Sequence, residues 1–349
     1  MKKLSPYQLL PGMILATDVY THGDHLLLPA GHILDEYSIS KLQESVGSVK
    51  IEHPTTRSEA IQKSPEFASF SKAFVENVST FKENLNVAVT NCDALDTDSL
   101  LENTLSMMDN ARDALHIFDM LYNMRHVDDL TFAHSLNVAL ICNVLAEWQG
   151  MSKEDIEIAT LCGLLHDIGK LVLPEEIINK KEKLTFEEMQ IFKKHPYEGF
   201  KILKSKGVDS RIANAALMHH ERCDGKGYPV GYTADKIDEF AKLVSIANDY
   251  DTTASNRAGM GISAPSPFSV IQMLEKEGLR KYDSFFVMTF LENIINTFIS
   301  NTVQLNDGRT GEVIMVDKNH PSRPLIKCPD NSFIDLREEP LSVFIEKII

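Results

Sequence analysis

The chain has 349 residues and carries 50 Asp and Glu against 35 Lys and Arg, which gives a formal net charge of −15 at pH 7. Such a charge disfavours non-specific binding to long nucleic acid, which needs a basic surface. A hydrophobic fraction of 43% is enough to build a sizeable core in two or three domains. No apolar run reaches the roughly 18 residues of a membrane span, and the N-terminus MKKLSPYQLLPGM lacks the features of a signal peptide.

The cysteines are odd in number and show no CxxC spacing; they are Cys92, Cys142, Cys162, Cys223 and Cys328. A dispersed set of this kind is typical of reduced thiols rather than of a disulfide framework. We therefore predict a cytoplasmic protein.

Residues 1–55 are predicted to form a small β-rich module. Gly23-Asp24 marks a turn between two β-rich runs, DEYSISKLQES is predicted as a short helix, and VKIEH as a closing strand. Residues 56–124 are more polar and helical, with apolar side chains at intervals. This segment predicts a helical connector, or a helical hairpin through which two copies of the chain could form a homodimer.

Apolar residues at helical spacing dominate residues 125–300. His134 lies on the apolar side of the first helix, where a lone histidine is more often a core residue than a ligand. Thr185 and Glu188 have the spacing of a capping box. The helix that they begin is expected to break at the His-Pro pair of 195–196, because proline disfavours helical geometry in the preceding residue.

Residues 301–349 change character again. In VQLNDGRTGEVIMV, Asp307-Gly308 separates two β-rich runs, which is a hairpin signature. PLIKCPDNSFIDL supplies one or two further strands. A small antiparallel β appendage without a catalytic constellation is predicted.

Two short segments concentrate polar groups where the neighbouring sequence is apolar. HDIGK contributes His166 and Asp167, and HHERCDGKGYP contributes His219 and His220. Burying such groups is costly unless they have partners. Three imidazoles and a carboxylate suit a divalent transition metal, so these segments predict a metal centre.

Several blocks occur in the order found in one known family; they are His134 with Ser135, HDIGK, His195 with Pro196, HHERCDGKGYP, and Tyr250-Asp251 with Arg257. On these blocks the chain resembles the HD-GYP family, a branch of the HD phosphohydrolase superfamily whose members hydrolyse cyclic di-GMP. The resemblance covers about half the chain, from roughly Asp128 to Phe298. It implies a mainly α fold, with an all-helical HD-type catalytic core at 125–300 between the two β-rich appendages.

The resemblance implies two divalent metal ions, with iron or manganese favoured by family habit. The implied ligands are His134, His166, Asp167 and Asn248 for one ion, and His195, His219 and His220 for the other, with Asp167 bridging. The family commonly has aspartate where this chain has Asn248, which removes one negative charge from the site. Leu130 stands where family members with three metals carry glutamate, so two metals are expected.

The resemblance also implies residues around the metals. Asp167 and Lys170 are the expected catalytic residues, and Lys170 is expected to reach a phosphate oxygen as a point charge. Its alternative role is a helix-end cation that complements the helix dipole. Tyr228 and Arg257 are expected to contact substrate. Three acidic residues are expected to orient metal ligands or loop amides; they are Glu221, Asp224 and Asp251.

The function that these implications favour is a metal-dependent phosphodiesterase of bacterial signalling, which opens cyclic di-GMP to linear pGpG and leaves GMP as a further possible product. One alternative is a catalytically weak relative that senses a nucleotide. Another is a phosphohydrolase for a different cyclic dinucleotide or for a nucleotide monophosphate. The expected partner is the cyclic dinucleotide, with neither long nucleic acid nor a membrane involved.

Overall fold

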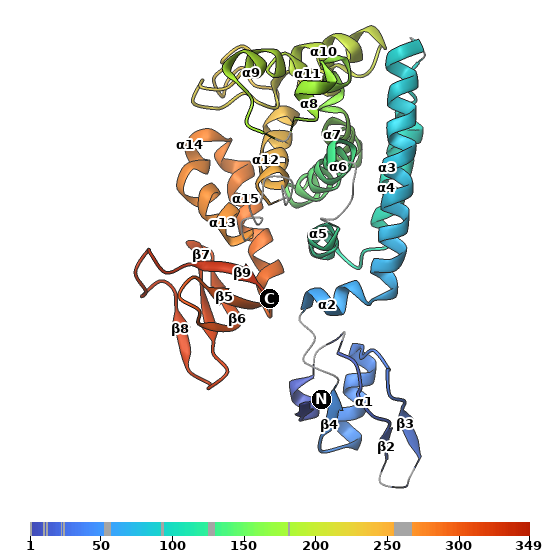
Figure 1. Ribbon diagram of the computed structural model, residues 1–349, viewed down its shortest axis with the longest axis vertical. Helices are drawn as coiled ribbons and strands as arrows, with labels where there is room; N and C mark the ends of the chain where they lie inside the picture. Colours follow the sequence, from blue (N-terminus) through green and yellow to red (C-terminus); the bar gives the residue numbers. More distant parts are fainter. Residues whose placement is uncertain are drawn as a thin grey trace.

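The computed structural model describes residues 2–9, 11, 13–21, 23, 25–51, 57–91, 94–124, 130–180, 182–254 and 267–349. It confirms the predicted fold class. Helices form the body of the molecule, and the strands belong to the two ends of the chain, both of which lie in the lower part of the view in Figure 1. Within the described ranges, no helix is long and apolar enough to cross a membrane.

The N-terminal module has an apolar core of its own, which includes Leu15, Leu42 and Ile51. Its elements are β1 (Lys2–Leu4), η1 (Pro6–Gln8), β2 (Val19–Tyr20), β3 (Leu26–Leu28), α1 (Glu36–Ser45) and β4 (Val49–Ile51). Strand β1 pairs antiparallel with β4, and β2 with β3. The helix and the closing strand predicted from the sequence are both present. Asp35 and Ser38 begin α1 with a reciprocal capping box.

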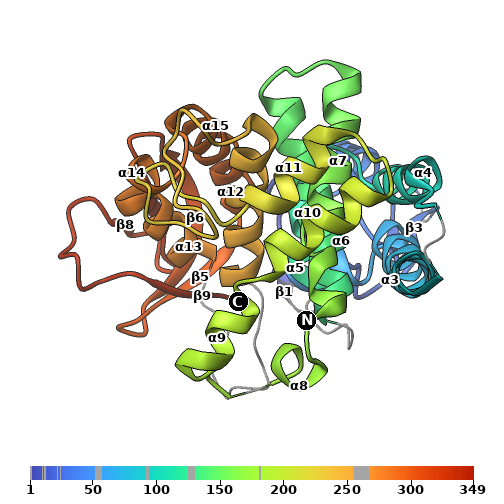
Figure 2. The same cartoon turned by 90° about the horizontal axis from the view of Figure 1, so that it is seen from above.

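The segment that follows, residues 57–91 and 94–124, is helical, as predicted, and it packs against the helical body. Its elements are α2 (Arg57–Gln62), α3 (Pro65–Asn91), α4 (Thr97–Met108) and α5 (Ala114–Asn123). Helices α3 and α4 lie side by side (Figures 1 and 2). Phe70, Phe74 and Met107 belong to the same apolar cluster as the later helices. The division into 1–55, 56–124, 125–300 and 301–349 stays a prediction, as does pairing of two copies.

The helical body contains α6 (Leu130–Trp148), α7 (Lys153–Leu165), η2 (Ile168–Val172), α8 (Glu175–Ile178), α9 (Phe186–Phe192), α10 (His195–Ser205), α11 (Ser210–Met218) and α12 (Glu239–Ala254). Helices α6 and α7 pack against each other, and α11 and α12 contact both α7 and one another (Figure 2). The predicted capping box of Thr185 and Glu188 begins α9. The predicted break is also present, because α10 begins at His195 with proline in its first turn.

Two glycines allow these elements to approach closely. A Cβ on Gly169 would lie 2.0 Å from the carbonyl oxygen of His195 and 2.4 Å from the nitrogen of Gly199. A Cβ on Gly163 would lie 2.8 Å from the Cα of Ala139. Only glycine fits at such separations, so η2 packs tightly on α10, and α7 on α6. These contacts bring HDIGK next to His195.

The C-terminal part combines a helical group with a sheet. The helical elements are α13 (Pro267–Met273), a π-helix (Leu274–Gly278), α14 (Leu279–Lys281), α15 (Ser284–Ile294) and η5 (Ile295–Phe298). The strands are β5 (Thr302–Leu305), β6 (Thr310–Asp317), β7 (His320–Lys327), β8 (Phe333–Asp335) and β9 (Ile345–Ile348). They form an antiparallel sheet in the order β8-β7-β6-β5-β9. The predicted Asp307-Gly308 hairpin joins β5 to β6.

Four cysteines lie in the described ranges, and all are free thiols. Cys142 and Cys162 are buried, and Cys223 and Cys328 are partly exposed. Burial raises the pKa of the Cys142 and Cys162 thiols. Cys92 lies outside the described residues.

Candidate metal centre

Six potential metal ligands converge from separate elements of the helical body. Their side chains form two groups, His134 with His166 and Asp167, and His195 with His219 and His220. Within each group, one ligand atom from each residue lies within 4.8 Å of the others. Helix α6 supplies His134, His166 and Asp167 lie between α7 and η2, α10 begins with His195, and His219 and His220 follow α11.

The carboxylate of Asp167 lies between the two groups. Its Oδ1 is 3.2 Å from Nε2 of His195 and 3.7 Å from Nε2 of His219. Its Oδ2 is 3.2 Å from Nε2 of His166 and 3.7 Å from Nε2 of His134. One oxygen thus faces each group, which is the arrangement that a bridging carboxylate requires.

Three of the imidazoles are turned by the same local device. Nδ1 of His166 donates to the carbonyl of Gly163 at 2.7 Å, Nδ1 of His195 to Phe192 at 2.8 Å, and Nδ1 of His219 to Ala216 at 2.9 Å. Each accepting carbonyl is three residues upstream and lies near a helix end, where carbonyls lack helical partners. These bonds place the proton of a neutral ring on Nδ1 and leave Nε2 with a bare lone pair.

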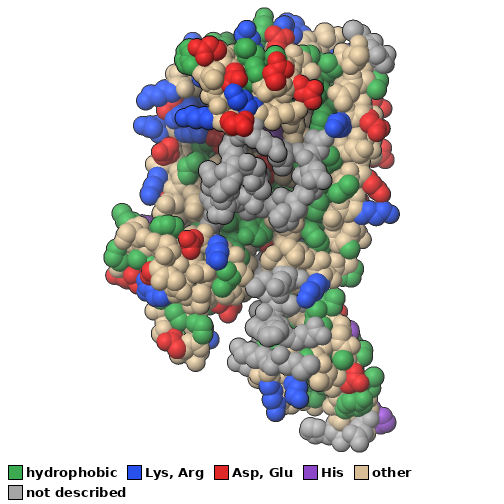
Figure 3. Space-filling model, viewed as in Figure 1, with side chains coloured by type: hydrophobic (Ala, Val, Ile, Leu, Met, Phe, Trp, Pro, Cys, Tyr) green, Lys and Arg blue, Asp and Glu red, His purple; other side chains and the backbone are tan. Residues whose placement is uncertain are grey.

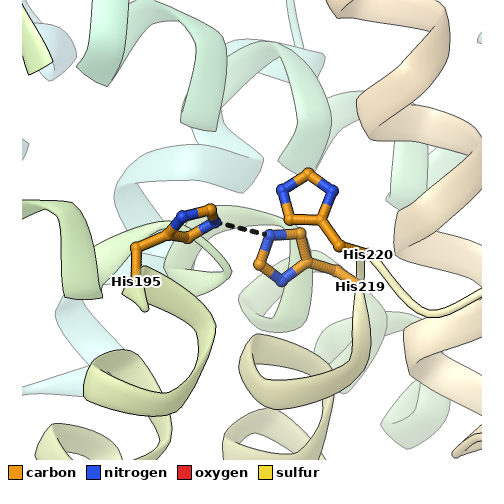
Figure 4. A group of neighbouring side chains, drawn as sticks. All are labelled: His195, His219 and His220. Atoms are coloured by element: carbon orange, nitrogen blue, oxygen red, sulfur yellow. Dashed lines mark hydrogen bonds between the residues drawn. The ribbon is translucent and has the colours of Figure 1, made fainter. Parts of the chain in front are cut away.

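The bare nitrogens face one another, which argues for a cation among them. Nε2 of His195 lies 3.2 Å from Nε2 of His219 (Figure 4). Burial lowers the pKa of both rings, so neither has a second proton to share. In the described part of the chain, His166 Nε2 and Asp167 Oδ1 are buried without a hydrogen-bond partner. Buried acceptors of this kind are costly unless a metal ion satisfies them.

The separations also fit metal coordination. Nitrogen and oxygen ligands of one ion, each at about 2.0–2.2 Å, stand roughly 3.0–3.5 Å apart. The contacts of Asp167 with His166 and His195 fall in that range, as does the contact between His195 and His219. Two His/Asp groups of this composition are consistent with a centre of two metal ions, and the residues therefore fit the cofactor that the sequence implied.

Asp167 is ionised despite its burial. Burial alone would raise the pKa of Asp167, but the positive charge of the neighbouring Lys170 ammonium opposes this effect, and that pKa is held well below its usual range. Lys170 Nζ lies 2.5 Å from Oδ2 of Asp167, and its ammonium also lies 5.4 Å from the centre of the Phe192 ring. With 17% of its side chain exposed, Lys170 is at the edge of the centre rather than inside it.

His134 is oriented by side chains instead of by the main chain. Its Nδ1 lies 2.7 Å from Oδ2 of Asp251, whose Oδ1 accepts a hydrogen bond from Asn137 at 2.9 Å. Its Nε2 lies 3.0 Å from Oδ1 of Asn248. Asp251 and Asn248 both come from α12 and are buried. The carboxylate behind the imidazole leaves Nε2 directed at Asn248 and Asp167.

The loop that follows His220 is organised by Glu221. This side chain is 3% exposed, and its two oxygens accept bonds of 2.7–3.1 Å from the amides of Val230, Gly231 and Tyr232. A Cβ on Gly227 would lie 2.5 Å from the Cα of Glu221. The Gly-Tyr-Pro run therefore packs closely against Glu221, at the start of the same loop. Asp224 also acts within this loop, where it contacts Arg222 at 3.1 Å and the Lys226 amide at 3.2 Å.

Tyr228 lies at the edge of the metal ligands. Its ring stacks on His220, with centroids 4.5 Å apart and an interplanar angle of 21°. Burial, and secondarily the charge of Asp167, raise the pKa of Tyr228, so the phenol stays protonated. The Lys193 ammonium lies 5.1 Å from the Tyr228 ring centre. The sequence analysis did not identify Lys193, although the pair of lysines immediately before His195 could have suggested it.

Further basic groups lie near the loop that follows His220. Figure 3 shows acidic and basic side chains intermixed on this face, with a group of basic ones at its left edge at the level of α14. Helix α14 carries Arg280 and Lys281, and Arg280 lies 3.8 Å from Asp224.

The remaining residue implied by the resemblance, Arg257, lies outside the described residues.

Replacing Glu221 with glutamine is expected to destabilise this loop. Hydrogen bonds to a charged acceptor contribute more than neutral ones, so we expect a loss of about 2 kcal/mol in the free energy of unfolding. Urea unfolding, with limited proteolysis at residues 222–236, measures the effect. Glu187→Gln, which changes an exposed side chain of α9, is the matched control. An equal, small loss in both variants would show that other contacts hold the loop.

The sequence of this chain is similar to the sequences of several named proteins. The chain is 30% identical over 209 residues to cyclic di-GMP phosphodiesterase PdeB of Borreliella burgdorferi, covering 59% of this chain and 54% of the relative. It is 31% identical over 196 residues to a cyclic di-GMP phosphodiesterase of Pseudomonas aeruginosa, covering 56% of this chain and 46% of the relative. The chain thus spans about half the length of these two relatives.

A third relative has a different substrate in its name. The chain is 37% identical over 131 residues to 3'3'-cGAMP-specific phosphodiesterase 1 of Vibrio cholerae, covering 38% of this chain and 30% of the relative. The family model described as HD domain matches residues 103–285, more than half of the chain. The resemblance to HD-type phosphodiesterases predicted from the sequence is confirmed, and the chain belongs to the HD domain family.

Proposed function

We propose that the chain is a metal-dependent phosphodiesterase that hydrolyses cyclic di-GMP to linear pGpG. The observation that carries this proposal is the pair of histidine groups that share Asp167, with the buried Nε2 of His166 lacking a hydrogen-bond partner among the described residues. The proposed ligands are His134, His166, Asp167 and Asn248 for one ion, and His195, His219, His220 and Asp167 for the other. Manganese or iron is the proposed metal.

The bound ions would lower the pKa of a water molecule and offset negative charge on the phosphodiester. The chain's own groups account for the rest of the proposed chemistry. Asp167 supplies the negative charge that both ions share. Lys170, at the edge of the centre, donates to a phosphate oxygen as charge develops there. The protonated hydroxyl of Tyr228 can donate to substrate, and its stacking on His220 holds the ring in place.

Cyclic di-GMP is favoured over other substrates by two relatives that align over more than half of the chain, both of which are named for it. A second candidate is 3'3'-cGAMP, which the higher identity over a shorter span supports. Asn248 supports a third candidate, a sensor that binds nucleotide without rapid turnover, because an amide supplies no negative charge to the first ion.

Incubation of metal-loaded protein with a panel of cyclic dinucleotides tests the proposal. Protein stripped of metal and reloaded anaerobically with Mn²⁺ or Fe²⁺ is expected to convert cyclic di-GMP to pGpG, and chromatography of the products also shows whether GMP forms. The same protein with His166→Ala is the control and should leave the substrate intact. Faster cleavage of 3'3'-cGAMP would assign that substrate instead. Two bound ions with no cleavage of any dinucleotide would favour the sensor.

A further inference from the structure

The amide of Asn248 has two chemically different ends, and the structure distinguishes them. Its Oδ1 lies 3.0 Å from Nε2 of His134, on the side of the candidate metal centre. Its Nδ2 lies 3.3 Å from Oδ1 of Asp249 and donates to it. Asn248 is only 5% exposed, so water has little access to either end. The neighbouring side chains therefore determine which end faces the metals.

Both carboxylate oxygens of Asp249 accept hydrogen bonds from neighbouring side chains. Its Oδ2 accepts from both the Lys281 ammonium and the Tyr282 hydroxyl. Its Oδ1 accepts from Asn248. Burial, and secondarily the charge of Asp249, raise the pKa of Tyr282, which keeps that hydroxyl a donor. Both oxygens of Asp249 thus have partners away from the histidines.

A carboxylate paired with a lysine offers only acceptors. It can accept from the NH₂ end of Asn248 but has nothing to donate to the oxygen end. The terminal torsion of asparagine is roughly two-fold, so a turn of the amide by half a revolution exchanges the two ends at little intrinsic cost. The reversed amide would direct its NH₂ group at His134 and at any cation beside it.

We propose that Asp249 is a positioning residue that holds the Asn248 carbonyl oxygen toward the first metal ion. This inference rests on the proposed metal centre and explains how an asparagine can serve there. An aspartate at 248 would present an oxygen in either orientation and would need no such partner. An asparagine needs one, and Asp249 provides it.

The support for Asp249 comes from a distant part of the chain. Lys281 and Tyr282 lie at the end of α14, and the carbonyl of Lys281 accepts from the amide of Cys223 at 2.9 Å. The same segment thus contacts both α12 and the loop after His220. The orientation of the amide therefore depends on the packing of α14 as well as on its sequence neighbour.

A double-mutant cycle with Asn248→Asp tests this inference, with Mn²⁺ as the probe. Metal-free protein is titrated by calorimetry. Asp249→Asn alone is expected to raise the dissociation constant of one of the two Mn²⁺ sites by about 10–100-fold, the usual effect of losing an outer partner of a metal ligand. In the Asn248→Asp background, the same change is expected to alter that constant by no more than about twofold.

Asp283→Asn is the matched control, because Asp283 pairs with Lys242 at 3.2 Å outside the centre and asparagine preserves its role at the start of α15. It should leave both Mn²⁺ sites unchanged. Circular dichroism of the metal-free variants checks folding. Tyr282→Phe, which keeps the carboxylate and Lys281, gives a milder variant that should weaken the same site by less than Asp249→Asn does.

Unchanged Mn²⁺ binding by Asp249→Asn would overturn the inference. An equal loss in both backgrounds would overturn it too, since Asp249 would then act through charge or folding rather than through the amide. The titration needs no catalysis. Protein that follows the expected cycle but cleaves no cyclic dinucleotide would refute the proposed function and leave the orientation of Asn248 standing.

Discussion

Asp167→Ala is expected to lose both metal ions and, with them, at least about 10³-fold in the rate of cyclic di-GMP hydrolysis. The reason is that one carboxylate contacts both histidine groups, with separations of 3.2 Å to Nε2 of His166 and to Nε2 of His195. Without it, each ion would face only neutral ligands. Elemental analysis of the purified variant, together with product chromatography, measures both losses.

The control for this variant is Asp98→Ala, which removes an exposed carboxylate from the first turn of α4. It should keep both ions and the full rate. The N-terminal module should remain folded in the Asp167 variant, because it has a separate core. Full occupancy by two ions in Asp167→Ala would contradict the bridging assignment.

Lys170→Ala is expected to separate metal binding from chemistry. The variant should keep two ions but lose about 10²–10³ in rate, the scale for removing one contact to a developing charge. The ammonium touches Asp167 from the edge of the centre, so its loss leaves all proposed metal ligands in place. Metal analysis and single-turnover hydrolysis give the two quantities.

A matched lysine is available as the control. Lys204 holds its ammonium 5.5 Å from the ring centre of Phe200, much as Lys170 does 5.4 Å from that of Phe192. Lys204 is exposed on α10 and should tolerate alanine without any change in rate. If Lys170→Ala also left the rate of hydrolysis unchanged, Lys170 would be only a helix-end cation.

Features that depend on a few neighbouring residues were predictable from the sequence. The capping box at Thr185, the helix start at His195 and the Asp307-Gly308 hairpin all follow from local backbone chemistry, and all are present. His166, Asp167, His219 and His220 were identifiable because two short motifs place them together. His134 and His195 were implied as ligands only by the family resemblance. Their convergence in space agrees with the metal centre that the sequence predicted, although the role of each residue stays a proposal.

Features that depend on tertiary packing were not predictable. A role for Asp249 could not be identified from the sequence, because its partners Lys281 and Tyr282 are brought to it by the docking of α14. The close approach of η2 to α10 at Gly169 is also a tertiary contact. An apolar stripe shows that a helix is covered, but not by which element. For this reason the packing of α3 and α4 on the helical body was missed.

The histidines are oriented in two ways, and a mutation can remove one kind of orienting contact more easily than the other. His166, His195 and His219 are aimed by main-chain carbonyls, which a change of side chain at the accepting residue does not remove. His134 depends on the carboxylate of Asp251, which a single codon change can delete. Evolutionary adjustment of metal affinity should therefore begin on the His134 side. That is the side where Asn248 already replaces the family's usual aspartate.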